Sequence, residues 1–253
     1  MISSNDLMVF YMGLELQSLA LYVLATFNRD QLKSSEAGLK YFVLSALSSG
    51  LLLYGCSLIY GFSGSTNFDV ISSQLNSSEY VLTFGIVFIL VGLAFKISAV
   101  PFHMWAPDVY EGAPTQVTAI MSTLAKVAAM ASFFKLITIL NSQMLYSYTQ
   151  VIVVVVIATM LFGNVMALRQ KKIKRVIAYS GISHTGFMLL TLLNINAAEN
   201  NLLFYAASYA IAGLAAFSVI LFVTKNEDND FIDNFKLNLF SDEIFVFTPK
   251  GDM

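Results

Sequence analysis

The sequence has little charge and almost no cysteine. Of its 253 residues, 12% are Asp, Glu, Lys or Arg, and the formal net charge is −2. A weak negative charge with no basic, aromatic-lined groove argues against a nucleic-acid partner. The one cysteine, Cys56, cannot form an internal disulfide or hold an iron–sulfur cluster, and it indicates a small core residue. Because phosphate-binding loops, zinc-ligand spacings and hydrolytic triads are also missing, we expect no metal, cofactor or redox centre in this chain.

Long apolar runs dominate what remains. Apolar residues make up 57% of the chain, and the mean hydropathy is +0.71. Transmembrane β-strands would alternate apolar and polar residues over about 10 positions, whereas these runs are apolar at consecutive positions. Several runs without Asp, Glu, Lys or Arg approach or exceed the roughly 20 residues of a membrane-spanning helix, among them 41–68, 80–95, 176–198 and 200–224. The sequence therefore predicts an all-α membrane protein.

About seven transmembrane helices are predicted. We expect Asn5 or Ser4 to cap the first helix. Small residues in the second helix should let its neighbours approach closely; they are Ser45, Ala46, Ser48, Ser49, Gly50 and Gly55. The predicted helices are 6–27, 37–62, 80–104, 115–139, 149–168, 176–193 and 201–223.

Two connections are expected to lack helices. Residues 63–79 are rich in Gly, Ser and Asn, and the segment 105–114 has two prolines and a glycine, which end regular helices. Asp108 and Glu111 in the second connection are expected to cap the following helix or to line an entrance.

The basic residues support this topology. If seven helices alternate in direction, the cations of the loops and tail all share one side, which the positive-inside rule assigns to the cytoplasm or matrix. The opposite loops contain none. The polar, acidic tail 225–253 is expected to be interfacial or disordered. The cations are Arg29, Lys33, Arg169, Lys171, Lys172, Lys174, Arg175, Lys225, Lys236 and Lys250.

Three ionisable residues fall deep inside predicted helices. At a rise of about 1.5 Å per residue, Glu15 lies ~14 Å, Lys126 ~17 Å and Lys96 ~24 Å from the start of its helix. An isolated charge at such depth costs about 3 to 15 kcal/mol, so these side chains should face the bundle interior and one another. Lys96 also precedes Pro101, and the pair predicts a discontinuous helix from about Lys96 to Pro101.

The arrangement has two interpretations. A buried lysine is pushed toward its neutral form by burial and toward its charged form by a carboxylate, so a lysine between these effects can change protonation when its neighbour moves. The alternative is a static ion pair between Glu15 and Lys96 that only fixes helix packing.

Three further residues are candidates for the path, and two of them, His103 and Lys135, are accessory candidates. His184 has polar neighbours in its helix and is either a proton carrier or a hydrogen-bonded core residue. His103 is either part of the path or an interfacial anchor beside Trp105, which we expect in the headgroup region. Lys135 lies near the outer end of its helix, where it can join the path or extend to the surface.

Four segments resemble a known family in the same order. They are GLELQSL around Glu15, FKISAVPFHMWAPDVYEGAPTQVTA around Lys96, LAKVAAMASFFKL around Lys126 and KRVIAYSGISHTGFM around His184. Over about residues 3–224 the chain resembles the chain 2 family of NADH–ubiquinone oxidoreductase (respiratory complex I), called subunit N in bacteria. The PDVYEGAP form is similar to this subunit rather than to its longer antiporter-like relatives in the complex or to the related cation/proton antiporters.

The resemblance implies an antiporter-like fold of about fourteen helices, made of two inverted five-helix repeats that each contain one discontinuous helix. This chain would hold the fifth to eleventh helices. The resemblance also implies that Glu15, Lys96, Lys126 and His184 form a proton relay driven by quinone reduction elsewhere in the complex. NADH, FMN, iron–sulfur clusters and ubiquinone would bind to other subunits of this proton-translocating NADH:ubiquinone reductase.

The resemblance carries expectations about partners and location. The family's earlier and later helices are missing from the sequence, so we expect a divided or truncated gene product and a second chain that supplies them. Other membrane-arm subunits and membrane lipids are the remaining expected partners. Alternative functions are a structural scaffold subunit without a complete proton path and a stand-alone cation/proton antiporter fragment. Composition favours the mitochondrial inner membrane, with the bacterial plasma membrane as the alternative.

Overall fold

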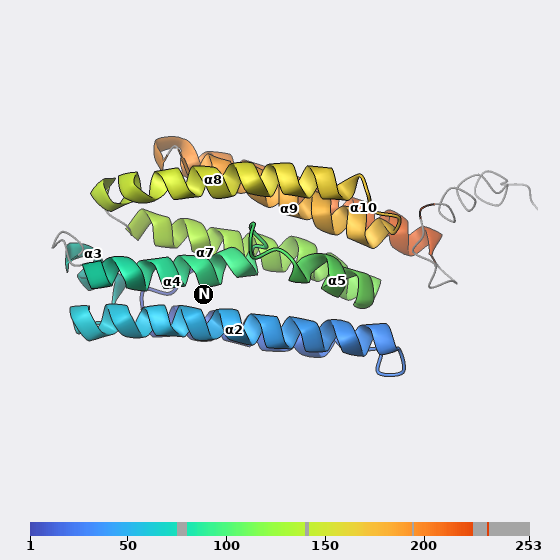
Figure 1. Cartoon of the computed structure of the whole chain (residues 1–253), viewed down its shortest axis with the longest axis horizontal. Coiled ribbons are helices and arrows are strands. Elements are labelled where there is room, and N and C mark those ends of the chain that lie inside the picture. Colours follow the sequence, from blue (N-terminus) through green and yellow to red (C-terminus); the bar gives the residue numbers. More distant parts are fainter. Residues whose placement is uncertain (75–79, 140–141, 194, 225–231, 233–253) are drawn as a thin grey trace, which may run out of the picture.

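The protein is a bundle of helices that run along one long axis (Figure 1). The computed structural model describes residues 1–74, 80–139, 142–193, 195–224 and 232; apart from Ile232, the predicted tail 225–253 lies outside the described residues. No β-strand occurs in these ranges, which confirms the predicted all-α class. The elements are α1 Leu7–Ala25, α2 Leu32–Ser63, α3 Phe68–Gln74, α4 Tyr80–Lys96, α5 Trp105–Gly112, α6 Thr115–Ile120, the π-helical turn η1 Met121–Ala125, α7 Lys126–Ile139, α8 Ser142–Ala167, α9 Ile173–Thr191 and α10 Ile195–Val223.

Five helical stretches of the described chain are long and apolar enough to cross a membrane. They are Leu7–Ala25, Leu32–Ser63, Thr115–Thr138, Thr149–Ala167 and Ala198–Val223. The third joins α6, η1 and α7 into one span. Of the two other predicted helices, α4 ends at its break and offers only the shorter apolar stretch Thr83–Lys96, and α9 is more polar because it contains Lys174, Arg175 and His184. The chain is a multi-pass membrane protein.

Close helix packing brings α2 and α4 together. A Cβ atom added to Gly55 of α2 would lie 2.6 Å from the carbonyl oxygen of Gly85 in α4, so only glycine permits this approach. The expected close packing of the second helix is confirmed at this point. Cys56 is 2% exposed and belongs to the largest apolar cluster, as expected for a core residue. On the other side of the bundle, α8 packs on α9, and α10 packs on α9 and η1.

The start of α1 differs from the prediction. Asp6, rather than Asn5 or Ser4, is its N-cap, and one carboxylate oxygen of Asp6 accepts hydrogen bonds from the backbone N–H groups of Met8 at 2.8 Å and Val9 at 3.1 Å. The hydroxyl of Thr66 donates to the other oxygen. This bond, followed by that from Val9, lowers the pKa of Asp6 below its ordinary value.

Both segments expected to lack helices contain one. In the first, α3 forms because Phe68 and Ile71 bury their side chains. In the second, α5 begins at Trp105, so Pro107 occupies the first helical turn, where the missing N–H would have had no helical partner. The expectation that proline would prevent a helix there was therefore wrong.

Candidate functional site

The helix break after Lys96 is stabilised by side chains of α8 and α9. In a continuous helix the carbonyl of Ile97 would accept from residue 101, but Pro101 has no N–H. Instead, the hydroxyl of Thr185 donates to the Ile97 carbonyl at 3.0 Å, and the N–H of Val100 donates to the hydroxyl oxygen of Thr159 at 3.0 Å. The predicted discontinuity near Lys96 to Pro101 is confirmed, and these freed backbone groups have the partners that a lipid environment requires.

Lys96, the last residue of α4, lies in a polar enclosure formed with α1 and α2. Its side chain is 7% exposed, and its ammonium lies 3.7 Å from Oε1 of Glu15. The ammonium donates to the hydroxyl oxygens of Ser18 at 2.7 Å and Ser45 at 2.8 Å. Ser49 donates to the Glu15 carboxylate. The structure therefore brings Glu15 and Lys96 together, as the cost of an isolated buried charge requires.

Ser18, Ser45 and Ser49 are the residues that sequence reasoning missed. Ser45 and Ser49 were interpreted as small packing residues of the second helix. A signal was nevertheless present, because residues four apart lie on one helix face, and Ser18 follows Glu15 by three positions. The phenol of Tyr22 also donates to the hydroxyl oxygen of Ser45 at 2.6 Å, so Ser45 is shared between Lys96 and Tyr22.

Lys126 forms a second polar site, where η1 meets α7. The residue is 2% exposed, and its ammonium donates to the carbonyl of Gly181 in α9 at 3.0 Å. Across the described ranges, Lys126 takes part in no ion pair. Four residues before Lys126, the carbonyl of Ser122 in η1 accepts a hydrogen bond from the phenol of Tyr209 at 2.9 Å. Such π turns are frequent at functional sites.

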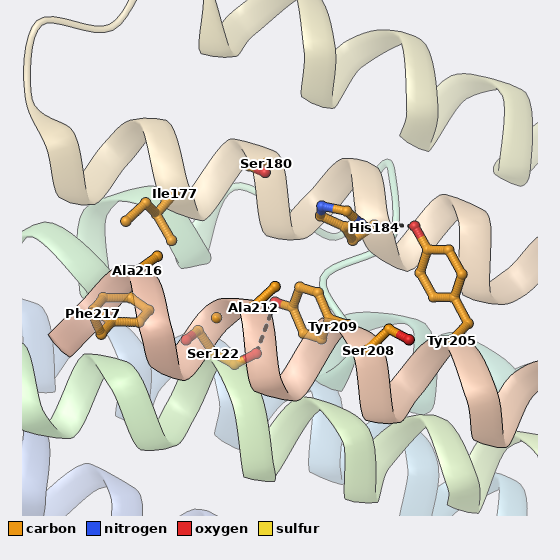
Figure 2. A pocket seen from close by; sticks show the side chains of 11 residues that line it. Ser122, Ile177, Ser180, His184, Tyr205, Ser208, Tyr209, Ala212, Ala216 and Phe217 are labelled. Carbon is orange, nitrogen blue, oxygen red and sulfur yellow. Dashed lines mark hydrogen bonds between the residues drawn. The ribbon is translucent and has the colours of Figure 1, made fainter. Parts of the chain in front are cut away.

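His184 lies beside this second site, in a cavity of about 350 Å³ between η1, α9 and α10 (Figure 2). Its Nδ1 lies 2.7 Å from the phenol oxygen of Tyr205, and which of the two donates depends on the tautomer. Figure 2 shows that Tyr205 and Tyr209 project from α10 toward the cavity, Tyr205 toward His184 and Tyr209 toward the Ser122 carbonyl. A Cβ atom on Gly181 would lie 3.2 Å from the Lys126 ammonium and 3.0 Å from the Tyr209 oxygen. Lys126 and Tyr209 therefore converge on Gly181, less than one turn before His184.

The two polar sites meet at Thr185. Lys96 and Lys126 have different hydrogen-bond partners. Between them, the Thr185 hydroxyl lies 3.0 Å from the carbonyl of Ile97, next to Lys96, and 2.9 Å from the carbonyl of Gly181, the acceptor of Lys126. The residue is fully buried.

The sequence pattern of the family described as NADH:quinone oxidoreductase/Mrp antiporter, TM, matches residues 4–243. The chain belongs to this family. NADH-quinone oxidoreductase subunit N of Pelagibacter ubique is 61% identical over 228 residues, which are 90% of this chain and 48% of that protein. The predicted resemblance to subunit N is confirmed, and the chain spans about half the length of the curated relatives it matches.

Solved structures agree with the antiporter-like fold. A chain of respiratory complex I from Thermus thermophilus with bound aureothin is 36% identical, with a TM-score of 0.74 over 87% of this chain and 47% of that one. A chain of the membrane-bound sulfane sulfur reductase, an archaeal respiratory membrane complex, is 27% identical, with a TM-score of 0.85 over 93% of this chain and 51% of that one. The predicted antiporter-like fold class is confirmed.

Lys135 and His103, the accessory candidates, lie elsewhere in this antiporter-family fold. The ammonium of Lys135 donates to the backbone carbonyls of Ile2, at 2.9 Å, and Ser4, and lies 5.8 Å from the ring centroid of Phe68. It therefore fixes the N-terminal turn. His103 is 5% exposed, and its ring packs edge-on against the ring of Phe162, with 5.1 Å between the ring centroids.

Trp105 was expected to be an interfacial anchor in the headgroup region, but its indole is buried inside the protein. The indole is 5% exposed and stacks between Tyr41 and Phe95, with ring centroids 4.8 Å and 5.5 Å away. Its N–H donates to the carbonyl of Phe95 at 2.9 Å. The indole thus supports the end of α4 from within the core. His103, two residues earlier, is likewise buried rather than an exposed interfacial anchor.

An ionic cluster joins α5 to the basic loop before α9. Glu111 accepts from Lys172 and, at 2.9 Å, from Arg175, which also donates to Asp108 at 2.9 Å. Burial alone would raise the pKa of Glu111, but the hydrogen bonds from Lys172 and Arg175 outweigh it and lower the pKa below its ordinary value. Asp108 and Glu111 do not cap the following helix; they line a polar cavity of about 200 Å³ between α2, α5 and α9.

The chemistry available at the two lysine sites is proton exchange. Ammonium, carboxylate, imidazole and hydroxyl groups can each give or accept a proton. Among the residues that the structure describes, no cluster of three or more His, Cys, Asp or Glu side chains could hold a metal ion.

Proposed function

We propose that this chain is a proton-translocating membrane-arm subunit of NADH:quinone oxidoreductase. It would contribute a buried relay of Glu15, Lys96, Lys126 and His184 that is coupled to quinone reduction elsewhere in the complex. The observation that carries the proposal is the contact of Lys96 with Glu15 at a helix break. A break and a buried charge are two costly features inside a membrane, and transporter folds place them together at ion sites.

Each relay residue has a role that follows from its contacts. Glu15 sets the charge balance at Lys96, and movement of the carboxylate away from its 3.7 Å contact would favour release of the proton. Lys126 carries a proton in the second site. His184 passes it toward Tyr205, whose phenol oxygen lies 2.7 Å from Nδ1. A neutral imidazole has one donor and one acceptor nitrogen and is suited to this transfer.

The remaining parts of the system are also proposals. NADH, FMN, iron–sulfur clusters and ubiquinone would bind to other subunits. The partners would be the other membrane-arm subunits and membrane lipids. The mitochondrial inner membrane stays a prediction for the location, and because the curated relative named above is bacterial, the bacterial plasma membrane is its direct competitor.

The test is Lys96→Met in the assembled complex, with NADH oxidation and proton uptake measured in the same sealed vesicles. The variant should lose most NADH-driven proton uptake. Lys171→Met, which removes an exposed lysine of the basic loop, is the matched control and should pump as the parent does. Normal pumping by a fully assembled Lys96→Met complex would refute the relay.

The same preparation separates the two alternatives. A scaffold subunit predicts that both lysine variants assemble and pump equally well. A stand-alone antiporter predicts sodium-dependent proton exchange by the purified chain in vesicles, without NADH. The family description also includes Mrp antiporters. Sodium-dependent proton exchange should therefore be measured together with NADH-driven proton uptake.

A further inference from the structure

Thr185 has more hydrogen-bond options than its single hydroxyl proton can satisfy. Its oxygen lies 3.0 Å from the carbonyl of Ile97 and 2.9 Å from that of Gly181, and a hydroxyl donates one hydrogen bond at a time. The first bond crosses from α9 to the helix break, whereas the second stays within α9. The direction of one proton therefore decides whether α9 is bonded to the break.

Lys126 competes for one of these acceptors. The Gly181 carbonyl accepts from the Lys126 ammonium at 3.0 Å, and as part of α9 it also faces the N–H of residue 185. A carbonyl oxygen has two lone pairs, so these two donors saturate it. While Lys126 donates, the Thr185 hydroxyl is directed to Ile97; when Lys126 withdraws, the hydroxyl can turn to Gly181 and release Ile97.

The Ile97 carbonyl lacks the backbone donor that could replace the Thr185 hydroxyl. Its helical partner would be the N–H of residue 101, which is proline. A buried carbonyl without a donor is costly in a membrane, so losing the Thr185 bond favours rearrangement of the break. The adjacent Ser98 has a φ of 62°, a conformation that is uncommon for a residue other than glycine. Lys96 precedes Ile97 directly, so such a rearrangement would move its ammonium relative to Glu15.

We propose that Thr185 is a positioning residue that couples the hydrogen bond of Lys126 to the helix break at Lys96. This inference rests on the proposed relay and adds its missing connection, since the two lysines share no hydrogen-bond partner. The titratable groups around the two lysines in the described part of the chain include one carboxylate, one imidazole and several phenols. They are Glu15, Tyr11 and Tyr22 on α1, Tyr41 on α2, Tyr110 on α5, His184 on α9, and Tyr205 and Tyr209 on α10.

The test compares three variants in the assembled complex. Thr185→Val keeps the branched shape and removes the hydroxyl, and Thr185→Ser keeps the hydroxyl and removes the methyl group. Thr159→Val is the matched control, because Thr159 supports the same break through Val100 but does not donate to the Gly181 carbonyl, which accepts from Lys126. Proton uptake per NADH oxidised is measured across pH, normalised to assembled complex on native gels.

Thr185→Val should lower proton uptake per NADH roughly two- to tenfold, the factor that one hydrogen bond represents, and should shift the pH profile of pumping. Thr185→Ser should restore both, and Thr159→Val should leave the pH profile unchanged. Equal effects of Thr185→Val and Thr159→Val would overturn the coupling and show that both threonines only support the break.

Lys96→Met separates this outcome from failure of the relay. If Lys96→Met stops pumping while Thr185→Val behaves as the parent, the relay stands and the coupling fails. If Lys96→Met pumps normally, the relay itself fails.

Discussion

Ser45 should be necessary for the function of Lys96 even though it carries no charge. Ser45→Ala removes one of the two serine hydrogen bonds of the Lys96 ammonium and the acceptor of the Tyr22 phenol. Hydrogen bonds to charged groups contribute about 1.5–3 kcal/mol in soluble proteins, whereas side-chain bonds between membrane helices average about 0.6 and reach about 1.7 kcal/mol. For a fully buried, charge-assisted bond we take about 1.5 kcal/mol, which corresponds to roughly a tenfold loss of proton transport.

Ser48→Ala is the matched control for this prediction. Ser48 lies on the same helix, is also buried, and donates to the Gly92 carbonyl of α4 at 3.0 Å, whereas the hydroxyls bonded to Lys96 and Glu15 are those of Ser18, Ser45 and Ser49. The assay is NADH-driven proton uptake by vesicles containing the assembled complex, with quinone reduction recorded in parallel. From the energies above, we expect proton uptake to fall roughly tenfold in Ser45→Ala and less than about threefold in Ser48→Ala. Equal losses would mean that the serines matter only for packing between α2 and α4.

Two further predictions concern stability. Gly55→Ala should lower the stability of the complex by about 1–3 kcal/mol through contact with α4, whereas Gly50→Ala, with open space around it, should be neutral or stabilising by up to about 1 kcal/mol; thermal unfolding in detergent distinguishes them. Glu111 has a pKa below its ordinary value, so its ion pairs stabilise the fold above about pH 4.3 and this contribution is lost as pH falls through the lower folded value. Thermal unfolding between about pH 6 and pH 3 should therefore be less pH-dependent in Glu111→Gln than in the parent, and an unchanged pH dependence would contradict this assignment.

Periodicity and composition predicted the helices well, because a membrane leaves the backbone few alternatives. The all-α class, the break near Pro101 and the contact of Glu15 with Lys96 follow from the cost of unsatisfied polar groups in lipid. The predictions failed where tertiary contacts decided the outcome. Trp105 was expected at the membrane surface because tryptophan is common there, but two aromatic rings and the Phe95 carbonyl hold it in the core.

Hydroxyl residues were the largest omission, for a physical reason. Serine and threonine are small enough to pack helices closely and polar enough to solvate a charge, and composition does not distinguish these roles. Only the contacts show that Ser18 and Ser45 solvate Lys96, whereas Ser48 packs on α4.

The distribution of these hydroxyls also bears on how a proton path could be switched. In the described part of the chain, five serine and threonine side chains are hydrogen-bonded to the break or to the Glu15–Lys96 pair: Ser18, Ser45, Ser49, Thr159 and Thr185. A hydroxyl can reverse its direction by rotating one bond, without moving charge through the low-dielectric interior, where an unpaired charge is most costly. Charge would then move only at the lysines and His184, while hydroxyl rotation sets which of them can exchange a proton. Removal of the Thr185 hydroxyl should therefore alter coupling between the two lysine sites more than it alters assembly, whereas replacement of Lys96 should stop most transport.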